Sequence, residues 1–241
     1  MEGFIDIHSH CLCSLDDGAH NIEETKIMLK EAYQQGIRTI ITTPHFHHHR
    51  GHASKAEIDL TLDIVQEAIQ ELLPGMKLYT GNELYYTSKL PELLQQEKVY
   101  TMAESQYVLI EFSPKEEFAG IRNGLYEIQG EGYWPILAHV ERYECFQKNF
   151  QQMEMIYDMG IYLQVNANSI TNGHSWGTKQ FIKRLLKEDM IHFIATDAHD
   201  AKERKPEIAE CINFLEKKCG KGSAERYFTQ HPQYILEHQM L

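Results

Sequence analysis

The chain has 241 residues, of which 42% are hydrophobic and 24% are charged, and its formal net charge is −12. We expect residues 1–241 to form a single domain with a sizeable core. The acidic balance argues against a nucleic acid as the main partner, because nucleic-acid-binding proteins usually carry basic stripes. It does not exclude a phosphorylated substrate, since bound cations can dominate the local field.

The chain contains no apolar run long enough to cross a bilayer and no signal-like N-terminus. We therefore expect a cytoplasmic protein without membrane insertion. The five cysteines include no Cys-x-x-Cys pair, and disulfides are not expected in a reducing compartment. Cys11 and Cys13 flank a histidine motif, where we expect them to pack against neighbours and not to bind metal.

Strand-like runs alternate with helical patterns along the whole chain. The first helix is predicted to begin at Asn21, with Glu24 three residues later, and to end at Gly36. The second is predicted to begin at Ser54 and to end at 74–75, a Pro-Gly pair. The predicted strands are 4–9, 38–43, 77–81, 107–112, 134–139, 162–165 and 192–196, and the later helices are 118–129, 153–159, 179–187, 206–218 and a segment from 223 broken at Pro232.

Seven strands that are each followed by a helix predict a parallel α/β fold, either an open sheet or a barrel. The polar residues favour a barrel, because most of them stand at or just past the ends of predicted strands. In a barrel these ends share one rim, whereas an open sheet would spread them along an edge. The residues concerned are His8, His10, His45, Glu83, Glu111, His139, Asp197 and His199.

Each of these residues has an ordinary alternative role. His8 and His10 are two residues apart, so both rings point to the same face of the strand end, yet they could be two satisfied histidines. His45 could be a core histidine, and a glutamate is more often an exposed carboxylate. Asp17 lies in Asp16-Asp17-Gly18, which could be a simple turn. The agreement of several such clusters favours metal binding.

Nine candidate ligands, all histidines or carboxylates, exceed the number that one ion takes. This donor set suits manganese, iron or zinc without selecting among them. Two or three adjacent divalent ions suit hydrolysis of a phosphoester, because they hold phosphoryl oxygens and lower the pKa of a bound water to roughly 7.

Taken together, the motifs resemble those of the PHP (polymerase and histidinol phosphatase) superfamily, and within it the manganese-dependent protein-tyrosine phosphatases of bacterial capsule and exopolysaccharide clusters, the CpsB/YwqE-like group. The resemblance spans residues 5 to 204 and implies a distorted (β/α)7 barrel with a trinuclear site on its rim. The motifs that carry it are Ile5-Asp6-Ile7-His8-Ser9-His10, Asp16-Asp17-Gly18, Thr43-Pro44-His45, Gly81-Asn82-Glu83, Leu109-Ile110-Glu111-Phe112, Ala138-His139-Val140-Glu141-Arg142 and Thr196-Asp197-Ala198-His199.

The resemblance also implies a role for each residue. One ion takes His8, His10, Glu83 and Asp197; Glu83 bridges to a second ion that also takes Glu111 and His139; and Asp17, His45 and His199 form the third set. Two or three Mn²⁺ ions per chain are implied, with iron or zinc as alternatives. Arg142 and Arg204 are expected to engage the phosphate, since a planar bidentate donor suits a phosphoryl group; the alternative is a solvated surface charge.

The activity implied is hydrolysis of phosphotyrosine by attack of a metal-bound hydroxide, with the tail of a cognate bacterial tyrosine kinase that controls capsule or exopolysaccharide synthesis as substrate. A histidinol-phosphate phosphatase and a non-catalytic, metal-stabilised regulator of a kinase remain as alternatives. A cysteine-dependent phosphatase is excluded, because no cysteine has an arginine six positions later.

Four further histidines crowd the loop after His45, namely His47, His48, His49 and His52. A loop histidine is usually solvated, and the cluster is only a compositional hint of metal binding.

Overall fold

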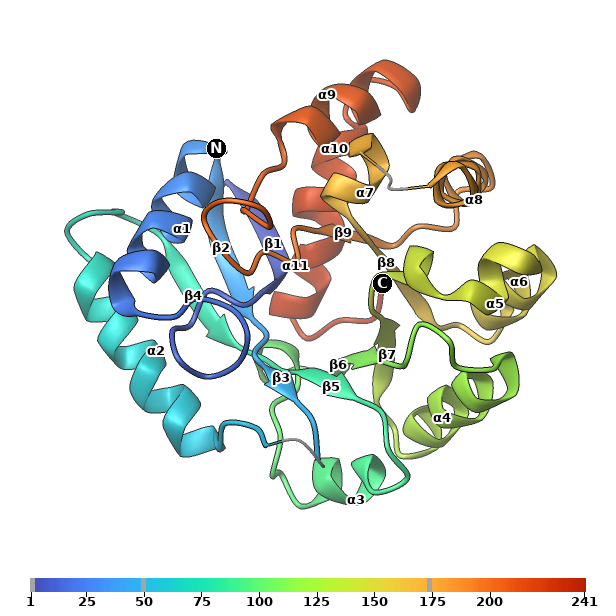
Figure 1. Cartoon of the computed structure of the whole chain (residues 1–241), viewed down its shortest axis with the longest axis horizontal. Coiled ribbons are helices and arrows are strands. Elements are labelled where there is room, and N and C mark those ends of the chain that lie inside the picture. The colour runs from blue at the N-terminus through green and yellow to red at the C-terminus, as the bar shows by residue number, and fades with distance from the viewer. Residues whose placement is uncertain (1–2, 49–50, 173–174) are drawn as a thin grey trace.

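The computed structural model describes residues 3–48, 51–172 and 175–241, and its centre is a curled sheet of parallel strands (Figure 1). Every predicted strand is present, and two short strands, β3 and β5, add to them. The strands are β1 (Phe4–Ser9), β2 (Ile37–Thr42), β3 (His45–Phe46), β4 (Lys77–Thr80), β5 (Glu83–Tyr85), β6 (Tyr107–Glu111), β7 (Trp134–Leu137), β8 (Tyr162–Asn166) and β9 (Phe193–Ala195).

The sheet runs in two hydrogen-bonded parts, β1-β2-β4 and β3-β5-β6-β7-β8-β9, and all pairings are parallel. The first and last strands also meet, because His10 N–H donates to the carbonyl of Ala198 and Asp197 N–H donates to that of His8, both at 2.8 Å. This contact curls the sheet into the distorted barrel that the sequence predicts.

Two of the seven predicted strands, 38–43 and 77–81, are each followed after a short break by a further strand. Residues 43–44, a Thr-Pro pair, separate β2 from β3, and residues 81–82, a Gly-Asn pair, separate β4 from β5. Pro44 has no N–H to donate to a neighbouring strand. A Cβ added to Gly81 would lie 3.1 Å from the carbonyl oxygen of Thr42, so the two interruptions lie close together. The offset strands β3 and β5 then pair His45 with Glu83.

Helices cover the outside of the curled sheet (Figure 1). Both predicted N-caps are confirmed: Asn21 accepts from Glu24 N–H, and Ser54 forms a complete capping box with Glu57. The helices are α1 (Ile22–Gln34), α2 (Lys55–Ile69), α3 (Leu90–Gln95), α4 (Phe118–Gly130), α5 (Glu144–Lys148), α6 (Phe150–Asp158), α7 (Ala167–Asn172), α8 (Trp176–Lys187), α9 (Ala209–Lys218), α10 (Ser223–Glu225) and α11 (His231–Leu236).

Two expectations about helices are wrong, and three short helices were not expected. Helix α2 ends at Ile69, before the Pro-Gly pair at 74–75. Pro232 does not break the last segment: the short π-helix Arg226–Gln230 leads directly into α11, and Pro232 lies in the first turn of α11. The short helices α3, α5 and α7 were not predicted, since each is no longer than six residues and shows no clear period. No helix among the described residues is long and apolar enough to span a membrane.

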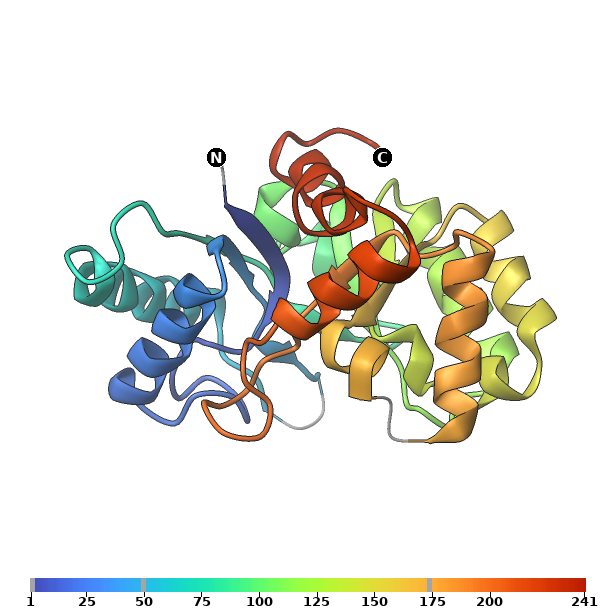
Figure 2. The same cartoon turned by 90° about the horizontal axis from the view of Figure 1, so that it is seen from above.

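Alternate residues of the strands face two different cores. Val108 and Ile110 pack under the helices, whereas Leu109 faces the inside of the curl. Residues of the other strands that also fill the inside include Ile7, Ile41, Ile136 and Ala195. The C-terminal segment closes the end of the sheet opposite the candidate site (Figure 2). Ile235 packs inside the curl, and the Tyr107 hydroxyl donates to the Gln239 carbonyl.

We expect Ile235→Ala to lower the free energy of unfolding by about 2–5 kcal/mol, because the side chain is fully buried and its removal leaves a cavity. Urea unfolding followed by circular dichroism measures the change. Met240→Ala is the control, since Met240 is 61% exposed and its truncation should change stability by less than about 0.5 kcal/mol. If Ile235→Ala were as stable as the unaltered protein, Ile235 would not pack inside the curled sheet as described.

Candidate metal centre

Most of the predicted ligands lie at or just past the carboxyl ends of the parallel strands, whereas His45 and Glu83 begin β3 and β5 and Asp17 lies in the loop after β1. These residues come close together because the carboxyl ends of the strands of a curled parallel sheet share one rim. The described residues contain three groups whose nitrogen and oxygen donors lie within 4.8 Å of one another. They are His8, His10, Glu83 and Asp197; His10, Asp17, His45 and His199; and His45, Glu83 and Glu111.

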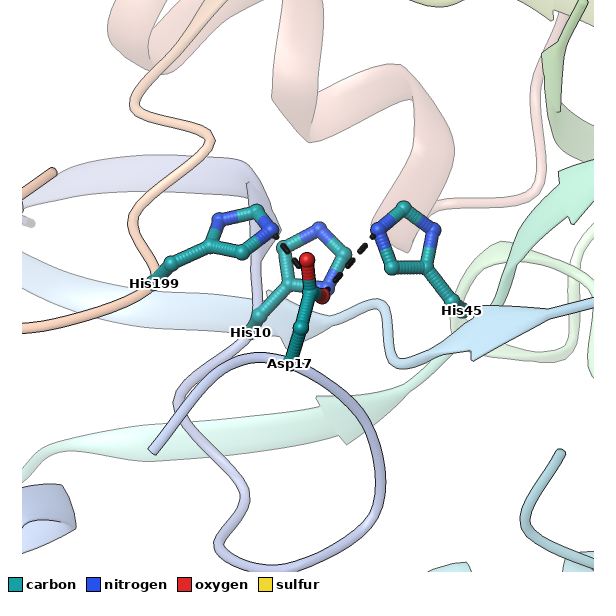
Figure 3. A group of neighbouring side chains, drawn as sticks. All are labelled: His10, Asp17, His45 and His199. Carbon is teal, nitrogen blue, oxygen red and sulfur yellow. Dashed lines mark ion pairs between the residues drawn. The ribbon is translucent and has the colours of Figure 1, made fainter. Parts of the chain in front are cut away.

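The second group is the most open part of the site. Figure 3 shows Asp17 between the rings of His45 and His199, with His10 behind it. Asp17 Oδ1 lies 3.4 Å from His45 Nε2 and 3.5 Å from His199 Nε2. The Asp17 side chain is 67% exposed, whereas that of His199 is 4% exposed, so this edge of the site faces solvent.

His139 completes the cluster on the opposite side. Its Nε2 lies 2.8 Å from Glu83 Oε1 and 3.5 Å from Glu111 Oε1. The grouping differs from the implied sets at three points: His10 also belongs with Asp17, His45 also reaches Glu83, and His139 belongs to none of the three groups. The assignment of each residue to a particular ion therefore stays a prediction.

Hydrogen bonds fix which ring nitrogen of three histidines faces the centre. His8 Nδ1 lies 3.1 Å from Gln164 Oε1, an oxygen that also accepts from His139 N–H. His10 Nδ1 lies 2.6 Å from Asp16 Oδ2, and His199 Nδ1 lies 3.0 Å from the carbonyl of Asp197. Each Nδ1 therefore carries the proton and donates. Each Nε2 is unprotonated, and its lone pair is available to bind a metal ion.

The buried atoms of the cluster fit a bound cation. Among the described residues, Glu83 Oε2, Asp197 Oδ1 and His199 Nε2 are buried without a hydrogen bond. Glu83 Oε2 nevertheless lies 3.2 Å from the Nε2 atoms of both His8 and His10. Buried polar atoms that converge without hydrogen bonding are costly unless a cation lies between them. A histidine and carboxylate set of this kind suits a divalent transition metal.

Electrostatics separates the two glutamates. Burial raises the pKa of Glu83, but its histidine neighbours outweigh burial and hold the pKa well below the usual value. Burial, and then the charge of Glu83, raise the pKa of Glu111 to about 8. Burial, and then the charge of Arg142, lower the pKa of His139 to about 4. Glu83 is thus ionised and His139 neutral at pH 7, which are the forms that bind metal.

Sequence reasoning missed two amides on β8, the one predicted strand without a candidate ligand. Gln164 Nε2 donates to Asn166 Oδ1 at 2.8 Å, and Asn166 Nδ2 donates to Asp197 Oδ2 at 2.7 Å. Both side chains are buried. The amides therefore link His8, His139 and Asp197. Two polar residues at the end of a buried strand were the signal that could have found them.

Backbone strain and a second carboxylate also position the ligands. His139 and Asp197 have positive φ angles of 32° and 52°, which residues with a Cβ rarely adopt and which recur at functional sites. Asp16, which the sequence offered only as a carboxylate beside Asp17, accepts from the His45 and Gly18 N–H groups. It therefore holds the first loop against β3.

The two predicted arginines both reach the cluster. Arg142 Nη2 lies 2.5 Å and Arg204 Nη2 lies 2.9 Å from Asp197 Oδ2. Their side chains are 37% and 36% exposed, so each keeps a solvent-facing side. A role in binding phosphate stays a prediction.

The histidine-rich loop lies outside this cluster. His47 stacks on Tyr85 with 4.3 Å between ring centroids, and the His52 ring lies 4.0 Å from that of Phe46. His49 lies outside the described residues. None of the donor groups found in the described parts of the chain includes His47, His48 or His52.

Comparison with known proteins identifies the family. A family profile described as capsular polysaccharide synthesis, CpsB/CapC, matches residues 4–237. The chain belongs to the CpsB/CapC family. This confirms the resemblance that the sequence motifs indicate.

Relatives of this CpsB/CapC chain match over nearly its whole length. It is 33% identical over 242 residues to the tyrosine-protein phosphatase CpsB of Streptococcus pneumoniae, covering 98% of this chain and 100% of that protein. It is 29% identical over 238 residues to the tyrosine-protein phosphatase YwqE of Bacillus subtilis (strain 168), covering 98% of this chain and 93% of that protein.

Solved structures confirm the fold of the CpsB/CapC chain. Crystal structures of YwqE from Bacillus subtilis and CpsB from Streptococcus pneumoniae, described as unique metal-dependent tyrosine phosphatases, match with a TM-score of 0.91 and 28% identity, covering 98% of this chain and 96% of that chain. The phosphotriesterase homology protein of Escherichia coli matches with a TM-score of 0.65 and 10% identity, covering 98% and 99%, and shares the fold alone.

We expect Gln164→Leu to lower the affinity of the CpsB/CapC chain for Mn²⁺ by about 10–100-fold, because the ring of His8 loses its orienting acceptor. Equilibrium metal titration measures this, and activity should recover at excess Mn²⁺. Gln129→Leu is the control, since Gln129 bonds the Met159 carbonyl away from the site. If Gln164→Leu binds Mn²⁺ with unchanged affinity after its metal has been removed and added back, Gln164 does not position His8 for metal binding.

Proposed function

We propose that this chain is a metal-dependent protein-tyrosine phosphatase. The observation that carries the proposal is the set of three overlapping donor groups at the ends of the parallel strands. The relatives support it, because CpsB and YwqE are named tyrosine-protein phosphatases and match the chain over nearly its full length. The family description adds a role in capsular polysaccharide synthesis.

We propose two or three Mn²⁺ ions, with iron or zinc as alternatives. His8, His10, Glu83 and Asp197 would hold one ion. Glu83, Glu111 and His139 would hold a second, and Asp17, His45 and His199 a third. When bound, the ions supply Lewis-acid polarisation of the phosphoryl group and an acidified water as nucleophile.

The protein's own contribution is positioning and charge. Arg142 and Arg204 are partly exposed beside Asp197, and the N–H groups on their exposed sides can donate hydrogen bonds to a phosphoryl oxygen. The tyrosyl leaving group has a pKa of about 10, so its departure needs little help from a general acid. The residues therefore need only to orient the phosphate and to neutralise its charge.

The thiols have no part in this chemistry. Burial raises the pKa of Cys11 to about 12, so this thiol stays protonated at pH 7. A thiol is a nucleophile only as a thiolate. All five cysteines are free, which suits a reducing compartment, and we propose a cytoplasmic location.

The substrate we propose is phosphotyrosine in a flexible segment of a cognate bacterial tyrosine kinase. Asp17 and His45 lie at the open edge of the site, so an extended segment can present a phosphotyrosine there. We also propose that residues 1–241 act as one domain, because the candidate ligands come from strands along the whole chain.

Activity should vanish on treatment with a strong chelator and return best with Mn²⁺. His139→Ala should lower kcat/KM on a phosphotyrosine peptide by two orders of magnitude or more, on the order of 3 kcal/mol or above. The reason is that the variant lacks the imidazole that lies beside Glu83 and Glu111 and is expected to bind metal with them. Circular dichroism checks the fold. His52→Ala is the control, since its loop lies outside the donor groups. Full activity of metal-loaded His139→Ala would contradict the assignment.

The substrate class separates the proposal from its rivals. We expect kcat/KM to be higher for a phosphotyrosine peptide than for histidinol phosphate or for a matched phosphoserine peptide, since phenolate leaves more easily than an alkoxide. Steady-state kinetics with the Mn²⁺-loaded protein measures the three values. A preference for histidinol phosphate would favour that phosphatase, and no turnover of any phosphoester would favour a regulator that only binds.

A further inference from the structure

A groove of about 880 Å³ lies between α8, α9 and the short π-helix Arg226–Gln230 that follows α10. Figure 1 labels α8, α9 and α10. Its floor is apolar and consists of Ile170, Ile182, Leu186, Phe214 and Tyr227. The volume is that of a typical ligand-binding cleft. None of the nine candidate metal ligands lines it.

The edges of the groove carry positive charge. Lys179, Lys183 and Lys187 follow one face of α8, four residues apart, with Lys218 and Arg226 on the other side. The one carboxylate in the lining is Asp189, which pairs with Arg226 at 2.7 Å.

Three of these lysines have no carboxylate to balance them. Lys187 Nζ lies 3.5 Å from Glu188, but no carboxylate of the described chain lies within ion-pair distance of Lys179, Lys183 or Lys218. The protein as a whole has a net charge of −12. A local positive groove on an acidic protein therefore attracts an anion that the remaining surface repels.

The groove begins beside the metal centre. Asn166, which donates to Asp197, is followed directly by α7, and Thr171 of α7 lines the groove. Five residues of helix span roughly 8 Å. Figure 2 shows that α7 and the N-terminal end of α8 lie at the end of the molecule opposite the C-terminal helices, which is the end that bears the site. An extended peptide of roughly three residues spans the same length as the helix between Asn166 and Thr171.

We propose that this groove binds an acidic segment of the phosphoprotein substrate, on the same chain as the phosphotyrosine held at the metal centre. The inference rests on the proposed phosphatase function. The apolar floor would take the aliphatic or aromatic side chains of the segment, and Lys179, Lys183 and Lys218 would take its carboxylates or further phosphates. The groove thus selects among phosphotyrosine sites by the charge of their neighbourhood.

The test compares three phosphotyrosine peptides on the Mn²⁺-loaded protein. One is short, one adds an acidic extension through a flexible linker of about six residues, and one adds a neutral extension of equal length. Both directions of extension are made. We expect the acidic extension to lower KM by about 3–10-fold relative to the neutral one with kcat unchanged, and this advantage to shrink between about 50 and 300 mM salt.

Charge removal assigns the effect to the groove. The variant Lys179→Gln, Lys183→Gln, Lys218→Gln should abolish the advantage of the acidic extension and leave turnover of the short peptide unchanged. The matched control is Lys30→Gln, Lys89→Gln, Lys98→Gln, which removes the same charge from exposed lysines elsewhere and should keep the advantage. Circular dichroism checks that both variants fold.

Failure of the groove and failure of the proposed function give different results. A protein that hydrolyses the short peptide but shows equal KM for both extensions, in both directions, overturns the groove proposal alone. The proposal is also overturned if the control variant loses the lower KM of the acidic extension to the same degree. It is overturned as well if light scattering shows a dimer that the groove variant dissociates. If no phosphotyrosine peptide is hydrolysed, the proposed function fails, and fluorescence anisotropy with the unphosphorylated acidic peptide still decides whether the groove binds it.

Discussion

The buried carboxylate of Glu83 lies among four imidazoles, and the arrangement of the rim follows from this contact. Its oxygens lie 2.8–3.2 Å from ring nitrogens of His8, His10, His45 and His139. A carboxylate without exposed surface is costly unless opposite charge or hydrogen bonds surround it. The four rings come from β1, β3 and the end of β7, which are far apart in sequence, so the curled sheet has to bring these strand ends together around Glu83.

The supporting groups lie on the strand that offers no ligand. Gln164 and Asn166 on β8 connect His8 to Asp197, and the Gln164 oxygen also holds the strained backbone of His139. A site held by packed strands and oriented rings keeps its shape better than one held by loops. Strained backbone and buried polar atoms are therefore concentrated at this rim. At the opposite end of the sheet, apolar side chains such as Ile235 fill the inside of the curl.

Charge connects the metal centre to the side groove. The chain is strongly acidic, yet its proposed substrate is an anion. The proposed cations at the rim would form one positive region and the lysines of α8 and α9 a second, with α7 between them. Positive charge along this path would favour an anionic segment there and raise its rate of encounter with the site.

The sequence by itself determined the seven strands, the two capped helices and the polar residues at the strand ends, because period, caps and residue type are local properties. It could not place His45 beside Glu83, since two strand interruptions shift their register. Nor could it find the roles of Gln164 and Asp16, because an amide or carboxylate that orients a histidine does so across strands. The end of α2 and the place of Pro232 differ from the local signals at 74–75 and 232, because such signals are weak predictors of helix ends. The groove too is purely tertiary: its lysines belong to separate helices, and only their packing makes one surface of them.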